Sequence, residues 1–74
     1  MKIIINAPIM NDKIINLLSE YKENGVEFNF IKKTGIKLEF EVSNIDGQSA
    51  SSLAKSLIRE SDFGKVLYFS VEVV

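Results

Sequence analysis

Side chains that could do chemistry gather in one stretch, where a glycine and three serines precede a predicted helix. Gly47, Ser49, Ser51 and Ser52 follow Asp46. The free amide hydrogens of a helix start can bind a small anion, and a serine there can also present a phosphorylatable hydroxyl. Serine at a helix start most often caps it, and no Gly-Lys-Ser/Thr triplet of a P-loop follows. The pattern favours a cap and keeps these four residues as candidate anion-binding residues.

Most other reactive groups are missing. The chain has neither histidine nor cysteine, which excludes imidazole bases, thiolate nucleophiles, disulfides and the common zinc sites. Glu39 and Glu41 lie two apart on a predicted strand and could hold a hard cation. Alternating charge of this kind is, however, typical of a solvated strand face. We therefore expect no catalytic residue, no metal and no cofactor, and we expect a protein that is not an enzyme.

Composition indicates one globular domain over residues 1–74, since 46% of the 74 residues are hydrophobic and 26% are charged. The net charge of −1 argues against nucleic acid or an anionic membrane as partner. Nothing resembles a signal peptide or reaches the roughly 20 apolar residues of a spanning helix. We expect a cytoplasmic location. The many Ile, Asn and Lys residues are typical of an AT-rich coding genome, such as that of a low-GC bacterium or its phage.

Periodicity then predicts the elements. Lys2–Asn6 is a β-branched strand that ends before Pro8. A helix follows with Asn11 as N-cap, Met10 packed on Ile15 as a hydrophobic staple, and Asn24-Gly25 at its end. Its apolar stripe comprises Ile14, Leu17, Leu18 and Tyr21.

Strict alternation over Val26–Phe30 and Ile36–Val42 predicts two strands. The Lys32–Gly35 segment between them predicts a hairpin turn. A second amphipathic helix runs from about Ala50 to about Ser61. A last strand covers Lys65–Val74.

The resulting order, β-α-β-β-α-β, predicts an α+β two-layer sandwich with one four-stranded antiparallel sheet and both helices on the same face. Its simplest form resembles the ferredoxin-like plait, with spatial strand order 4-1-3-2. Other two-layer sandwiches share the element order with different strand neighbours, so the strand order stays open.

Alternation also sorts the side chains between the two faces of this sheet. The set expected to face the helices is Ile3, Ile5, Val26, Phe28, Phe30, Ile36, Leu38, Phe40, Val42, Leu67, Phe69, Val71 and Val73. The set expected to face outward is Lys2, Ile4, Asn6, Glu27, Asn29, Ile31, Lys37, Glu39, Glu41, Ser43, Val66, Tyr68, Ser70 and Glu72.

One apolar group on the outward face predicts an interface. Ile4, Val66 and Tyr68 are expected to be neighbours across the first and last strands, with Val74 nearby. Val66–Val71 is also an uncharged run on an expected sheet edge, and such an edge pairs with other chains unless it is blocked. We expect a homodimer or a protein partner here. The alternative is a harmless edge guarded by Lys65 and Glu72.

Several families share this element order. The RNA-recognition motif stacks bases on aromatic residues of its central strands, whereas this chain would present Ile4, Lys37, Glu39 and Glu41. The heavy-metal carriers of this fold need cysteines, and acylphosphatases need an arginine in the first loop; the only arginine is Arg59. Plait dimers of the ACT type sense small ligands between subunits, which keeps a ligand-sensing regulatory domain as the alternative function.

A second resemblance concerns the first loop. Ile5-Asn6-Ala7-Pro8 resembles the corresponding stretch of the histidine-containing phosphocarrier proteins of bacterial sugar uptake. That resemblance implies a phosphorylated side chain at the start of the first helix. Asp12 takes the place of the family's histidine, and Ile14 takes the place of its arginine. A phosphocarrier-like or anion-binding protein is therefore the lesser alternative.

Overall fold

The computed structural model describes residues 1–65 and 67–74 of the chain. In chain order the elements are β1 (Lys2–Asn6), α1 (Asn11–Glu20), β2 (Glu27–Thr34), β3 (Lys37–Ser43), α2 (Gly47–Glu60) and β4 (Ser70–Val73). The expected α+β class with two helices and a four-stranded sheet is confirmed. Within the described part of the chain, neither helix has the length and apolar character needed to cross a bilayer.

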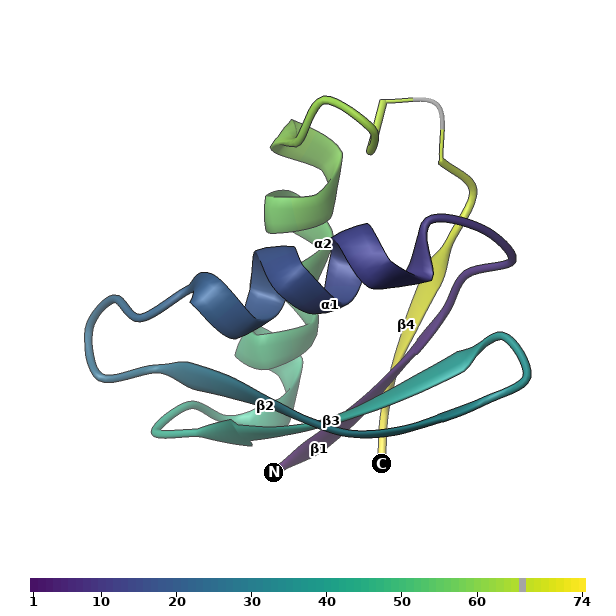
Figure 1. The fold of residues 1–74 in the computed structure, drawn as a ribbon. Helices are drawn as coiled ribbons and strands as arrows, with labels where there is room; N and C mark the ends of the chain where they lie inside the picture. Colours follow the sequence, from purple (N-terminus) through teal and green to yellow (C-terminus); the bar gives the residue numbers. More distant parts are fainter. Residues whose placement is uncertain (66) are drawn as a thin grey trace.

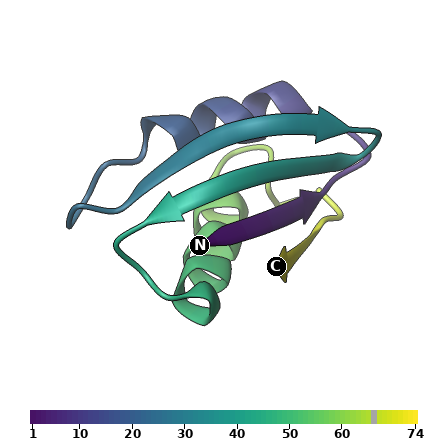
Figure 2. The same ribbon diagram turned by 90° about the horizontal axis from the view of Figure 1, so that it is seen from below.

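The sheet is antiparallel throughout, with strand order β2-β3-β1-β4. Read from the β4 edge, this order is 4-1-3-2. Figure 1 shows both helices above the sheet, and the view from below in Figure 2 shows its opposite face uncovered. Helix α1 packs against β2, whereas α2 packs against β1 and β4. The molecule therefore has one covered and one open sheet face.

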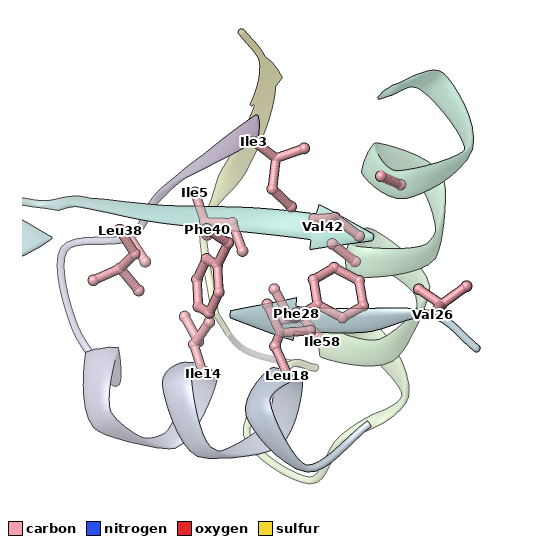
Figure 3. Close-up of a cluster of buried hydrophobic side chains, with 13 residues drawn as sticks. Ile3, Ile5, Ile14, Leu18, Val26, Phe28, Leu38, Phe40, Val42 and Ile58 are labelled. Atoms are coloured by element: carbon pink, nitrogen blue, oxygen red, sulfur yellow. The ribbon is translucent and has the colours of Figure 1, made fainter. Parts of the chain in front are cut away.

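The core lies between the sheet and the two helices (Figure 3). Alternate residues of β1 and β3 point into it, as the period of two requires. Its fully buried members include Ile3, Ile5, Leu38 and Phe40 from the strands, and Ile14, Leu18, Ala50, Ala54 and Ile58 from the helices. Burial at these positions confirms the predicted inward face for the two central strands.

The junction of β1 and α1 differs from the prediction. Met10, not Asn11, is the N-cap residue, and it has left-handed backbone angles with φ 64° and makes no side-chain cap. Asn11 is the first helical residue, and its Nδ2 donates to the Ala7 carbonyl at 2.8 Å. The amide thus bonds backward to the loop, which the N-cap preference of asparagine does not reveal.

The β2–β3 hairpin extends further than its sequence pattern predicts. β2 continues through the expected turn residues to Thr34, and the chain reverses at Gly35-Ile36. A bulge at Ile31 makes this extension possible, because one extra residue restores the pairing of the strands. Gly35 has φ 61°, as the first position of a two-residue hairpin turn requires. Ile36, predicted to face the helices, is instead 50% exposed in the turn.

The last strand is shorter than predicted. β4 starts at Ser70, not at Lys65, and residues 67–69 approach it without strand structure. Register confirms the expected faces within β4: Val71 and Val73 stand opposite Ile5 and Ile3, which point into the core. Val73 lies at the rim, however, and remains 49% exposed.

Candidate functional site

The outer edge of β4 carries unpaired backbone groups. The Val74 N–H donates to the Lys2 carbonyl at 3.0 Å, and in an antiparallel ladder only every second residue bonds to a given neighbour. Val71 and Val73 occupy the alternate positions, so their N–H and C=O groups point away from β1. β4 is also an outermost strand of the sheet. This edge can therefore accept another strand.

The side chains along this edge are largely apolar. Val73 is 49%, Val74 68% and Tyr68 87% exposed, whereas Phe69 and Val71 are half-buried and pack on the core. We call Tyr68–Val74 the β4 edge segment. Glu72 is its one charged residue. A strand that paired here would meet apolar side chains on the helix side and polar ones on the open side.

The polar side of the β4 edge segment is ordered by one asparagine. The Nδ2 of Asn6 donates to the Ser70 Oγ at 3.2 Å and to the Glu72 Oε1 at 2.9 Å. Asn6 lies directly opposite Ser70 in the β1–β4 register. The serine and the glutamate are thereby held side by side on the open face, two residues apart on the outermost strand.

A hollow of about 390 Å³ adjoins the start of the β4 edge segment. It lies between the end of α2 and the segment that leads to β4, and it is lined by Arg59, Gly64, Lys65, Leu67, Tyr68 and Phe69. The two cations and the two aromatic rings give it the chemistry to take an anion with an apolar part. No residue pattern in the sequence indicated this hollow, because its lining comes from the end of α2 and from a segment without helix or strand structure.

Of the four residues predicted to form the interface, the three that the structure describes do not make one cluster on the open face. Ile4 is half-buried on the central strand β1, where Glu39 and Glu72 flank it on the neighbouring strands. Tyr68 precedes the strand, and Val74 follows its last residue. Val66 lies outside the described residues. Tyr68 and Val74 do belong to the β4 edge segment, so the apolar surface follows the edge of the sheet.

The predicted anion-binding residues surround a helix start that already has a carboxylate. Asp46 is the N-cap of α2: its Oδ1 accepts from the Ser49 N–H at 2.9 Å and its Oδ2 from the Ser49 Oγ at 3.0 Å. These two hydrogen bonds, the backbone one first, lower the pKa of Asp46 below its usual value. Asp46 is therefore the N-cap residue of α2, and the prediction of a serine cap was wrong.

The remaining three candidates offer no cradle to an anion. Gly47 is buried, and a Cβ added there would lie 2.6 Å from the Val73 Cγ1. Ser51 is 9% exposed, whereas Ser52 lies in the open. The negative charge of Asp46 repels an anion from the same amides. Anion binding here remains a prediction without geometric support.

The glutamates of the open face have cationic neighbours. The Nζ of Lys2 lies 3.5 Å from the Glu39 Oε2, and the amino group of Met1 lies 3.0 Å from the Glu41 Oε1. In residues 1–65 and 67–74, no three acidic side chains come together as a metal would need. These contacts fit the interpretation of the glutamates as part of a solvated face.

The comparisons with known proteins add no relative: no protein-family model, curated protein or solved structure matches the chain.

Proposed function

We propose that this protein is a small non-enzymatic interaction module that binds a second copy of itself through the outer edge of β4. The observation that carries the proposal is the set of backbone groups of Val71 and Val73 that point away from the sheet, beside exposed apolar side chains. Strand addition to such an edge gains main-chain hydrogen bonds along its whole length. The sequence left two modes of association open, strand pairing at the sheet edge and packing on the open face, and this proposal takes the first.

The proposed architecture is the ferredoxin-like plait. In its support, the strand order reads 4-1-3-2 from the β4 edge, and each helix connects two parallel strands that have another strand between them. Both helices lie on one face (Figure 1). In this arrangement pairing of two β4 strands would join two sheets into one, with helices on the same side.

A charge on the β4 edge tests the proposal. Val73→Lys puts a charged side chain on the helix side of the β4 edge, beside the path of a paired strand, and lysine is one of the residues that protect natural edges. The matched control is Ile31→Lys on the β2 edge, because Ile31 is 43% exposed and Val73 49%. Sedimentation velocity from about 10 μM to about 1 mM covers the affinities expected of a small interface.

The wild type is expected to gain mass toward a dimer over this range, and so is Ile31→Lys. Val73→Lys is expected to stay monomeric, while its circular dichroism spectrum stays that of the wild type. A wild type that remains monomeric at the highest concentration would overturn the proposal. So would equal association of the two lysine variants.

The hollow beside Arg59 and Lys65 favours a second candidate function, the binding of a small anionic ligand. Its aromatic lining suits a carboxylate or phosphate that carries an apolar group. A ligand that binds only the folded state raises the melting temperature. We expect thermal shifts with aromatic carboxylates or nucleotides that are lost in Arg59→Gln. No shift with either class of compound would rule this candidate out.

A further inference from the structure

We propose that Ser70 and Glu72 set the register of the paired β4 strands, with Val71 of one copy opposite Val71 of the other. This inference rests on the proposed association through β4. Because the outward backbone groups belong to the odd-numbered residues, only registers that bring odd-numbered residues opposite one another form hydrogen bonds. The side chains on the open face then distinguish among these registers.

Centring the pair on Glu72 would bring two carboxylates together. In that register Val71 pairs with Val73 of the other copy, and the two Glu72 residues form a non-hydrogen-bonded pair. The Cα atoms of such a pair lie about 4.5 Å apart. Like charges directly opposite each other destabilise a sheet. The contact of each Glu72 with Asn6, at 2.9 Å, holds the carboxylates on the same face, so this register is disfavoured.

Centring the pair on Val71 replaces this repulsion with two attractions. Glu72 then lies opposite Ser70 of the other copy, whose hydroxyl can donate to the carboxylate, and the two-fold axis makes this contact twice. The bonded positions become Val71 with Val71, and Phe69 with Val73. Pairing on Val73 instead would place Glu72 opposite Val74 of the other copy, whose side chain has no donor for the carboxylate. The Val71 register, by contrast, gives Glu72 a hydrogen-bond donor and bonds both Val71 and Val73.

This complementarity also indicates why the partner is a second copy. A donor and an acceptor two residues apart on one face of a strand match the same pair on an antiparallel copy. Asn6 fixes both side chains before association, since it donates to the Ser70 Oγ and the Glu72 Oε1. Less rotamer freedom is then lost on binding.

Single cysteines can report the register, because the chain has none of its own. Paired residues in a bonded position have Cα atoms about 5.5 Å apart, which lies inside the reach of a disulfide at roughly 4.4–6.8 Å. Diagonal residues, at about 7–8 Å, lie outside it. We would oxidise Val71→Cys alone, Val73→Cys alone and an equal mixture of the two, and measure the disulfide-linked species by mass spectrometry. Glu72 stays intact in every sample.

The proposal predicts that Val71→Cys alone forms a linked dimer, in about five-fold excess over the mixed species, which corresponds to a like-charge cost near 1 kcal/mol. Predominance of the mixed species, or of the Val73→Cys dimer, would overturn the register. Absence of any link in the cysteine variants, when the wild type does sediment as a dimer, would also overturn it and would place the interface elsewhere. A wild type that stays monomeric overturns the association itself.

Glu72→Gln gives an independent check without cysteine. If the two Glu72 residues face each other, removal of the charge strengthens the dimer several-fold. In the proposed register it leaves the dissociation constant unchanged or weakens the dimer, because the serine loses a charged acceptor. Strengthening in sedimentation equilibrium would therefore contradict the proposal.

Discussion

β2 and β4 form the two edges of one sheet, and they are anchored and protected in different ways. β2 spans 8 residues, and its Phe28 and Phe30 join Tyr21 and Phe40 in three edge-to-face contacts with ring centroids 5.5–6.4 Å apart. β4 spans 4 residues and packs on the core mainly through Val71. The long edge is therefore bound firmly to its own domain, and the short edge is bound more weakly.

The two edge strands also differ in how well they are protected against pairing with other chains. β2 has a bulge at Ile31 followed by Lys32 and Lys33, and bulges and lysines both discourage strand pairing. β4 has neither device, and its one charge is Glu72. β4 can therefore pair with another strand more readily than β2. This difference depends on a few residues that can be substituted.

The largest expected effect is a loss of stability at the β2 side. Phe28 is 2% exposed, and truncation of a buried phenylalanine costs about 3–5 kcal/mol. Val71→Ala removes a smaller, half-buried side chain and should cost about 1 kcal/mol. Urea unfolding of Phe28→Ala and Val71→Ala against the wild type measures both. Equal costs would show that the two edges are anchored alike.

A smaller effect is expected when the protection of the β2 edge is removed. Lys32→Val with Lys33→Val removes the only charged side chains between Phe28 and Ile36. An uncharged edge of this kind can pair with another strand. In a Val73→Lys background, which blocks β4, these substitutions should restore concentration-dependent association. Sedimentation velocity detects it. If this triple variant gives only monomers, the bulge alone protects β2.

The smallest expected effect concerns α2, the helix that packs against β4. Asp46 caps α2, where Gly47 packs against Val73. The lowered pKa of Asp46 means that its ionised form stabilises the fold. That contribution is present above the unfolded-state pKa near 3.9 and is lost as the pH falls through the lower folded-state pKa.

Asp46→Asn keeps a cap acceptor but cannot titrate. The melting temperature of the wild type should exceed that of Asp46→Asn by a few degrees near pH 6, and the difference should shrink toward about pH 3. Calorimetry at several pH values measures it. A difference that is constant with pH would mean that the charge of Asp46 does not stabilise α2.

The central strands and both helices were predictable because their apolar residues follow one clear period. Ile3, Ile5, Leu38 and Phe40 alternate with polar residues and are all buried. The ends of elements were less predictable, since competing local contacts decide them. The side chain of Asn11, for example, bonds to the Ala7 carbonyl and leaves the cap position to Met10.

The sequence predicted which segment of the chain carries the candidate interface, but not which groups of that segment face a partner. An uncharged run near the C-terminal part of the chain indicated an interface there, and Tyr68 and Val74 are indeed exposed. Alternation alone placed Tyr68 on a strand that starts only at Ser70. Whether the backbone groups of Val71 and Val73 point outward depends on which residues of β4 hydrogen-bond to β1. No local sequence pattern encodes this pairing.

The most direct test of the central claim is amide hydrogen exchange, measured residue by residue by NMR at low and high protein concentration. Strand addition at β4 predicts that the amides of Val71 and Val73 exchange more slowly as concentration rises, while the outward amides of β2 do not change. Slowing confined to β2, or no change at either edge, would contradict the account.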